Sequence, residues 1–151
     1  MLREAFGERL KQAMRAKDAR TLSSVRMILA ALKDHDIAAR GTGNTEGIDE
    51  ADILRLLQGM IKQRRDSIAL YRQGNRPELA EREEQEIAVI ESFLPKQMSD
   101  DEIAAAAREA IVETGAAGVK DMGKVMGVLR ERHAGIIDMA RAGAVVKQLL
   151  G

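Results

Sequence analysis

Apolar residues recur along this chain at intervals of three and four positions, and no segment sustains an alternation of apolar and polar residues. The first spacing places side chains on one face of an α-helix, whereas alternation would indicate a half-buried strand. We therefore predict an all-α protein. The expected helix faces are, in chain order, Leu2, Phe6, Leu10 and Met14; Leu22, Val25, Leu29 and Leu32; Ile53, Leu57, Met60 or Ile61, Ile68 and Tyr71; Leu79, Ile87, Ile90 and Leu94; Ile103, Ala107, Ala110 and Ile111; Met122, Val125, Met126 and Leu129; and Met139, Ala142, Val146 and Leu149.

Polar residues and glycines mark the expected ends of these helices. Ser99 and Glu102 have the spacing of a capping box, in which each side chain accepts a backbone N–H from the other residue. Gly74 is expected to take a left-handed C-cap conformation, Asn75 to cap the following helix and Pro77 to lie in its first turn. Three further helices have an aspartate where an N-cap is expected, namely Asp18, Asp49 and Asp138.

Pro95 interrupts the helical pattern and divides the chain into two parts. The helices before it are long, and those after it are shorter. The fold class that we expect is therefore all-α, with an N-terminal long-helix hairpin or bundle domain over residues 1–95 and a compact C-terminal three-helix domain over residues 99–151.

The composition excludes several classes of site. The chain has no cysteine, which excludes disulfides and thiolate metal sites, and its two histidines, His35 and His133, are far apart in sequence. We therefore expect no metal ion and no cofactor. The only aromatic residues are two phenylalanines and one tyrosine. These are too few for a surface that stacks the bases of single-stranded RNA.

Charge and hydropathy bear on partners and location. Lys and Arg number 24, as do Asp and Glu, so the net charge gives no indication of a nucleic-acid partner. No basic leader followed by an apolar run opens the chain, and no apolar run approaches the roughly 18 residues that a bilayer requires. We expect a cytoplasmic protein with no membrane partner.

A basic cluster in the third expected helix is the first feature that could bind a ligand. Arg65, Arg72 and Arg76 are spaced seven and four positions apart, so on a continuous helix they would form a row that could follow a phosphate backbone. The alternative is an ordinary solvated helix face. The pattern by itself leaves both interpretations open.

Arg64 differs because it lies on the apolar stripe, between Ile61 and Ile68. If the third and fourth helices form an antiparallel hairpin, the level opposite Arg64 lies near residue 85. We therefore expect a structural ion pair between Arg64 and one of three nearby carboxylates, Glu83, Glu84 or Glu86. Desolvation offsets most of the attraction in such a pair, so it is expected to set the register of the hairpin more than its stability.

The second candidate site lies at residues 120–127. Gly123 and Gly127 stand about one helical turn apart, with Lys120 and Lys124 beside them. Each glycine costs a helix about 1 kcal/mol relative to alanine, so we expect something to approach this surface closely. The alternatives are another helix of the same domain, or an RNA backbone or partner protein. From residue 118 onward, six basic residues stand against three acidic ones, a small bias towards an anionic partner.

Several segments of the chain resemble the YqeY family. The residues 62–64 read Lys-Gln-Arg, 74–76 read Gly-Asn-Arg, and 91–99 read Glu-Ser-Phe-Leu-Pro-Lys-Gln-Met-Ser. The segment 120–126, Lys-Asp-Met-Gly-Lys-Val-Met, is similar to a block shared by YqeY proteins and the tail of GatB, the amidotransferase subunit that works on misacylated tRNA. The similarity runs over nearly the whole length, and the chain is identified as a member of the GatB/YqeY family.

This resemblance implies two helical domains, the second similar to the GatB tail domain that contacts the body of tRNA. It makes tRNA, and enzymes that modify or aminoacylate tRNA, the expected partners. The family also carries the label of a carbon–nitrogen ligase with glutamine as amide donor, which comes from the larger enzyme. The RNA contacts that the resemblance implies are Lys120, Gly123, Lys124 and Gly127.

The chain departs from the family pattern before its last helix. The related segment usually reads Gly-Arg-Ala-Asp, whereas residues 135–138 read Gly-Ile-Ile-Asp. The glycine and the capping aspartate remain, but the arginine is absent. Arg141, one turn into the last helix, is the candidate to take over its contact.

The sequence shows no self-sufficient catalytic machinery. A stand-alone amidotransferase needs a nucleophile and an ATP site, and the chain has neither a cysteine nor a Walker A loop, so we assign no catalytic activity to it and leave open whether it is an enzyme. The function that we expect is that of an accessory module that binds tRNA or associates with a tRNA amidotransferase. Two alternatives stay open. One is a subunit active only inside a larger amidotransferase; the other is a helical protein–protein adaptor without RNA affinity, suggested by the eight methionines, among them Met122, Met126 and Met139.

Overall fold

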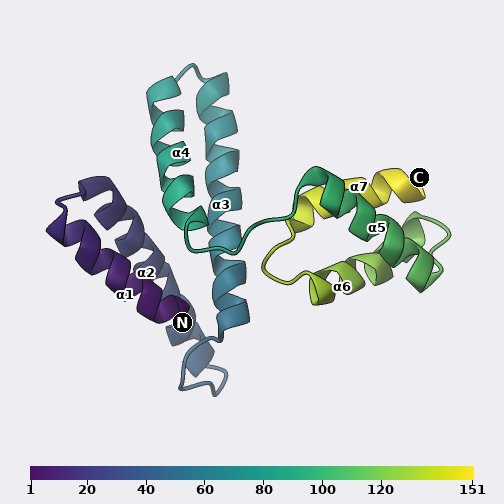
Figure 1. Ribbon diagram of the computed structural model, residues 1–151, viewed down its shortest axis with the longest axis horizontal. Helices are drawn as coiled ribbons and strands as arrows, with labels where there is room; N and C mark the ends of the chain where they lie inside the picture. The colour runs from purple at the N-terminus through teal and green to yellow at the C-terminus, as the bar shows by residue number, and fades with distance from the viewer. The chain divides into compact units, whose positions relative to one another are not determined.

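The structure, a computed structural model, describes all residues from 1 to 151 and contains helices and connecting segments only (Figure 1). The prediction of an all-α fold is confirmed. The chain divides into two compact units, Met1–Leu94 and Pro95–Gly151. The elements are α1 (Leu2–Arg15), α2 (Ala19–Arg40), α3 (Glu50–Gln73), α4 (Pro77–Glu91), α5 (Asp100–Thr114), the short 3-10 helix η1 (Val119–Asp121), α6 (Met122–Arg132) and α7 (Met139–Leu150).

The N-terminal unit consists of two helical hairpins, α1 with α2 and α3 with α4 (Figure 1). Its core is formed by side chains from all four helices, among them the fully buried Phe6, Ile28, Leu57 and Ile90. Burial of one such side chain stabilises the fold by about 1.5–3 kcal/mol. The ring of Phe6 meets that of Phe93 edge to face, with centroids 4.8 Å apart, so the segment after α4 is packed onto α1.

Two expected core positions, Leu149 and Met14, are wrong. Leu149 is 42% exposed, and its neighbour Leu150 packs against the core instead. Met14 is 55% exposed, and Ala13 is buried in its place. The expected stripe advanced in steps of four residues, and each step of four rotates about 40° beyond a full helical turn. Met14 is therefore rotated by about 120° from Leu2, whereas Ala13 is rotated by only about 20°. The helix buries the residue that keeps the 3.6-residue period.

Four of the expected N-caps are present, whereas Asn75 does not cap α4. The carboxylate of Asp18 accepts the N–H of Thr21 at 3.1 Å, and the carboxylate of Asp49 accepts that of Asp52 at 2.9 Å. Ser99 and Glu102 form the full capping box. Asp138 accepts the N–H groups of two residues in the first turn of α7. These local signals place the helix starts correctly because each side chain satisfies backbone N–H groups that have no partner within the helix.

The turn between α3 and α4 differs from the expectation. Gly74 has φ −82°, an ordinary right-handed value, and Asn75 takes the left-handed conformation with φ 57°. The residue at the N-cap of α4 is Arg76, whose side chain does not cap the helix, and Pro77 is the first residue of α4 as expected. Asparagine tolerates the left-handed region better than other residues with a Cβ, so it takes the conformation that was assigned to the glycine.

The C-terminal unit packs α5, α6 and α7 around a second core, which includes the fully buried Ile103, Val125, Leu129 and Val146. The segment that leads into α5 is bound to this unit. The N–H of Met98 donates to the carbonyl of Ile136 at 2.9 Å, and the side-chain amide of Gln97 donates to the carbonyl of Gly135 at 2.9 Å. None of the helices in the structure combines the length and the apolar character needed to cross a membrane.

Candidate nucleic-acid interface

The segment 120–127 forms an exposed surface on one side of α6, which we call the glycine face. Lys120 lies in η1 and Lys124 in the first turn of α6, and both side chains are exposed. The opposite side of α6 is buried in the core through Val125 and Leu129. Neither lysine takes part in an ion pair, whereas Arg132, at the far end of α6, is paired with Glu113 of α5. The lysines of the glycine face are therefore available to an anionic ligand.

The two glycines of this face are not covered by any other element of the C-terminal unit. A Cβ atom added at Gly123 or at Gly127 would meet no heavy atom within 4 Å beyond the backbone of α6 itself. The interpretation that another helix of the same domain packs against these glycines is therefore wrong. The close approach between α6 and α7 occurs at Gly143, where an added Cβ would lie 3.6 Å from the Cε atom of Met122 and 3.8 Å from that of Met126.

Arg130 belongs to the same surface and was not among the expected site residues. It lies seven positions after Gly123 and three after Gly127, which places all three residues on one side of a helix. Its side chain is exposed and forms no ion pair. The spacing was visible in the sequence, but only the contrast with the paired Arg132 distinguishes Arg130 as a free cation.

Arg141 lies at the other end of the C-terminal unit. Its guanidinium is 3.8 Å from the carboxylates of both Asp100, the first residue of α5, and Asp138. Lys120 and Lys124, in contrast, follow the C-terminal end of α5. Because α5 has 15 residues, its two ends are about 21 Å apart. The structure therefore does not bring Arg141 together with the lysines of the glycine face.

The arginines of α3 do not form the continuous row expected from their spacing. The helix ends at Gln73, so Arg76 lies outside it. Each arginine also has a carboxylate partner: Arg65 is 3.7 Å from Glu91, Arg72 is paired with Glu84, and Arg76 is 2.8 Å from Glu78. These pairs are exposed and individually weak, but they reduce the positive charge that the three side chains present to a ligand.

Arg64 makes the ion pair that the hairpin register predicts. Its Nε donates to the Oε2 atom of Glu86 at 3.0 Å, and the carboxylate of Glu83 is 3.9 Å away. The Nη1 group donates to the carbonyl of Met60, so the guanidinium is held by both helices of the hairpin. Burial, followed by the neighbouring Glu86, raises the pKa of Glu83 above its usual range. The third candidate carboxylate, Glu84, pairs with Arg72 instead.

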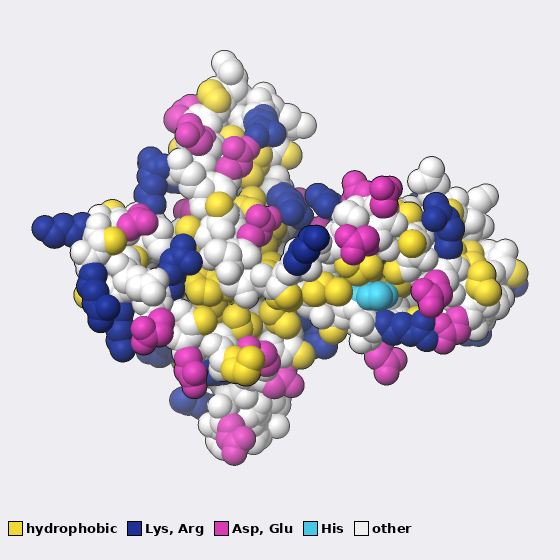
Figure 2. Space-filling model, in the orientation of Figure 1, with side chains coloured by type: hydrophobic (Ala, Val, Ile, Leu, Met, Phe, Trp, Pro, Cys, Tyr) yellow, Lys and Arg dark blue, Asp and Glu magenta, His cyan; other side chains and the backbone are white.

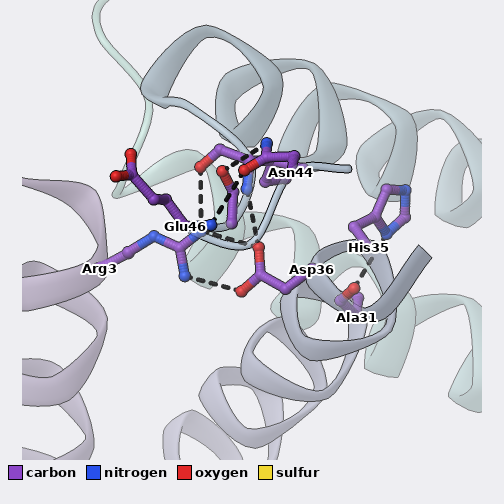
Figure 3. A network of polar contacts seen from close by, with 8 residues as sticks. Arg3, Ala31, His35, Asp36, Asn44 and Glu46 are labelled. Carbon is purple, nitrogen blue, oxygen red and sulfur yellow. Dashed lines mark hydrogen bonds and ion pairs between the residues drawn. The ribbon is translucent and has the colours of Figure 1, made fainter. Parts of the chain in front are cut away.

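A second polar network was not expected from the sequence. Arg3 of α1 forms two hydrogen bonds of 2.8 Å with the carboxylate of Asp36 in α2, and it also donates to the carbonyl of Ile48 (Figure 3). Asp36 in turn accepts the N–H of Ile48 at 2.9 Å. The hydrogen bond from Arg3 is the main reason that the pKa of Asp36 falls to about 2. The sequence carries no local signal of a contact between residues 33 positions apart. In the structure, the bonds from Arg3 and Asp36 to Ile48 hold the loop between α2 and α3.

The methionines that suggested an adaptor are part of the core. Met122, Met126 and Met139 are partly buried and pack against the apolar cluster of the C-terminal unit. They fill space between helices, which is the commoner use of methionine. The observation that motivated a methionine-rich binding groove therefore does not support one.

The remaining candidates for chemistry do not gather into a site. No group of three or more histidine, aspartate or glutamate side chains is placed to hold a metal ion. His35 uses its Nδ1 atom in a contact with the carbonyl of Ala31, one turn earlier in α2. Acidic and basic side chains are interspersed over much of the surface of each unit seen in Figure 2.

Fold and surface together define a two-unit helical protein whose C-terminal unit presents an uncovered glycine face with unpaired cations. A family model described as Yqey-like protein matches residues 3–150. The chain belongs to this family.

Among curated proteins, the chain is similar to fungal proteins named "Altered inheritance of mitochondria protein 41, mitochondrial". It is 39% identical over 85 residues to those of Vanderwaltozyma polyspora and Lachancea thermotolerans, and 32% identical over 85 residues to that of a Saccharomyces cerevisiae strain. Each alignment covers 56% of this chain and 43–44% of the relative. The chain therefore matches less than half the length of these relatives.

These names contradict the expected cytoplasmic location, because the relatives are mitochondrial proteins by name. The expectation depended on the absence of a basic leader followed by an apolar run. Mitochondrial targeting segments are amphipathic and rich in arginine and serine, and they have no such run. A search for an apolar run cannot detect such targeting segments. The prediction of a cytoplasmic location was therefore wrong.

Proposed function

We propose that the protein is an accessory module that binds tRNA through the glycine face of its C-terminal unit. The observation that carries this proposal is that Gly123 and Gly127 lie bare on α6 between unpaired cations, with no heavy atom beyond the backbone of α6 itself within 4 Å of an added Cβ. Glycine in an exposed helix costs about 1 kcal/mol relative to alanine. The presence of two exposed glycines despite this cost is explained if a ligand has to come close to the helix backbone.

The chemistry of the surface suits the sugar–phosphate backbone rather than the bases. Lys120, Lys124 and Arg130 can each contact a phosphate. The C-terminal unit contains no Phe, Tyr or Trp, so it lacks the large aromatic rings on which bases usually stack. The expected binding is therefore largely independent of RNA sequence.

The similarity of residues 120–126 to the block found in the tail of GatB supports tRNA as the RNA. It also supports an association with the glutamine-dependent amidotransferase or with other enzymes that act on tRNA. The carbon–nitrogen ligase activity itself would belong to such a partner, since the chain brings no cysteine nucleophile and no ATP-binding loop.

The experiment that tests the proposal is a titration of the full chain against bulk tRNA at several salt concentrations. The expected Kd is about 1–100 μM, and the affinity falls steeply as salt rises because bound cations release counterions from RNA. In the Lys120→Ala/Lys124→Ala variant the affinity falls. The slope of log K against log salt becomes shallower by about 2, one for each lost phosphate contact.

The matched control is Arg26→Ala/Lys33→Ala, which removes the same charge from exposed, unpaired positions of α2 in the N-terminal unit. It should leave the salt slope unchanged. Absence of binding at low salt, or an equal loss in both double variants, would overturn the assignment of the glycine face.

A further inference from the structure

Asp121 has an unusual place in the glycine face. It stands at the N-cap position of α6, yet its carboxylate does not cap that helix. The Oδ2 atom instead accepts the N–H of Ala117 at 3.0 Å, and the N–H of Asp121 donates to the carbonyl of Gly118 at 2.9 Å. The loop between α5 and α6 is thus closed by both the side chain and the backbone of Asp121.

Lys120 lies inside this closed loop. The loop leaves α5 through Gly115, which has φ 67°, and enters η1 at Val119. The hydrogen bond from the N–H of Ala117 to the carboxylate of Asp121 holds the loop in place between Gly115 and η1. Without it, residues 116–118 would be free to sample more conformations, and the backbone from which Lys120 projects would move with them.

The electrostatic effect of Asp121 on an anionic ligand is unfavourable, since it places a negative charge between Lys120 and Lys124. We propose that Asp121 is a positioning residue for the RNA contact. Its carboxylate orders the loop that carries Lys120, so that Lys120 is held beside Gly123 and Lys124 before RNA arrives. This inference rests on the function proposed above.

Two substitutions separate the charge of Asp121 from its hydrogen bond. Asp121→Asn keeps an oxygen that can accept the N–H of Ala117 and removes the negative charge, so the full chain should bind tRNA about two- to fivefold more tightly. Asp121→Ala removes the same charge and the acceptor. It should bind about three- to tenfold more weakly than Asp121→Asn, because RNA must then order the loop.

A control pair on α6 isolates the hydrogen bond. Glu131 is exposed and makes no hydrogen bond to the loop, so Glu131→Gln and Glu131→Ala should bind tRNA equally. A readout without RNA is amide hydrogen exchange: the N–H of Ala117 should exchange faster in Asp121→Ala than in Asp121→Asn or the unchanged protein.

The outcomes are distinguishable. Equal binding by Asp121→Ala and Asp121→Asn, or a matching loss in Glu131→Ala relative to Glu131→Gln, would overturn the positioning role while leaving the RNA site intact. Failure of the unchanged protein to bind tRNA would overturn the proposed function and this role with it. In that case the exchange of Ala117 would still show whether Asp121 orders the loop.

Discussion

The Nε atom of Arg64 donates to the Oε2 atom of Glu86 at 3.0 Å and joins α3 to α4 in the middle of their hairpin. Arg64 is only 8% exposed, which makes it the one buried charged residue of the chain. A charge in this position is tolerated because both the carboxylate and the carbonyl of Met60 satisfy the guanidinium.

Loss of this contact should destabilise the N-terminal unit. We expect Arg64→Ala to lower the free energy of unfolding by about 2–4 kcal/mol, because it removes a buried cation and leaves Glu86 without its partner. Urea denaturation measures the change. The control is Lys62→Ala, which breaks an exposed pair with Asp66 and should cost no more than about 0.5 kcal/mol. A similar small cost for both variants would contradict the expectation.

Asp36 should make the stability of the protein sensitive to acid. Its pKa is lowered from 3.8 to about 2 in the folded state, mainly by the hydrogen bond from Arg3. The folded state therefore binds this proton less readily than the unfolded chain, and the stabilisation is present above pH 4 and is lost as the pH falls from about 4 to 2. Urea midpoints measured across this range should fall less steeply in Asp36→Asn. Parallel curves for the two proteins would show that the contact does not form in solution.

The turn at Gly74 and Asn75 offers a test of backbone conformation. Gly74 has a negative φ and an added Cβ would approach no atom closer than 3.4 Å, so Gly74→Ala should be neutral or stabilise by up to about 1 kcal/mol. Asn75 has φ 57°, and Asn75→Ala should cost about 1 kcal/mol. Thermal unfolding compares the two. The reverse order of stabilities would mean that Gly74, and not Asn75, takes the left-handed conformation.

The glycine face should show opposite effects on stability and binding. Gly123→Ala and Gly127→Ala add a Cβ that meets nothing in the chain, so each should stabilise α6 by up to about 1 kcal/mol. The same methyl groups should weaken tRNA binding if RNA approaches the helix backbone. Calorimetric unfolding and the tRNA titration measure both quantities on the same samples. A more stable protein with unchanged affinity would remove the glycines from the site.

Two arginines of α6 should differ in their contribution to RNA binding. Arg130 is unpaired on the glycine face, whereas Arg132 is paired with Glu113 of α5. Arg130→Ala should make the slope of log K against log salt shallower by about 1, and Arg132→Ala should change it less. Both variants remove one positive charge from the same helix, so equal effects would indicate a diffuse electrostatic attraction without a defined contact.

Local signals in the sequence were sufficient for most of the secondary structure. The capping box of Ser99 and Glu102 and the N-caps of Asp18, Asp49 and Asp138 depend on neighbouring residues only, and the structure contains all of them. The errors at Met14, at Leu149 and at Gly74 arose where two adjacent residues were both suitable. In the helices, the 3.6-residue period decided which of the two neighbours is buried. At the turn, the left-handed conformation falls on Asn75 and not on Gly74.

The sequence by itself determined most of the helices and the pairing of Arg64 across the hairpin, because these depend on periodicity, capping and a simple antiparallel register. Only the tertiary structure decided which cations are free. It pairs the arginines of α3 with the carboxylates of α4, ties Arg141 to Asp100, and leaves Lys120, Lys124 and the two glycines uncovered. The network of Arg3 and Asp36 likewise required the fold. Contacts between residues far apart in the chain depend on how helices pack, and a one-dimensional pattern of charges does not contain that information.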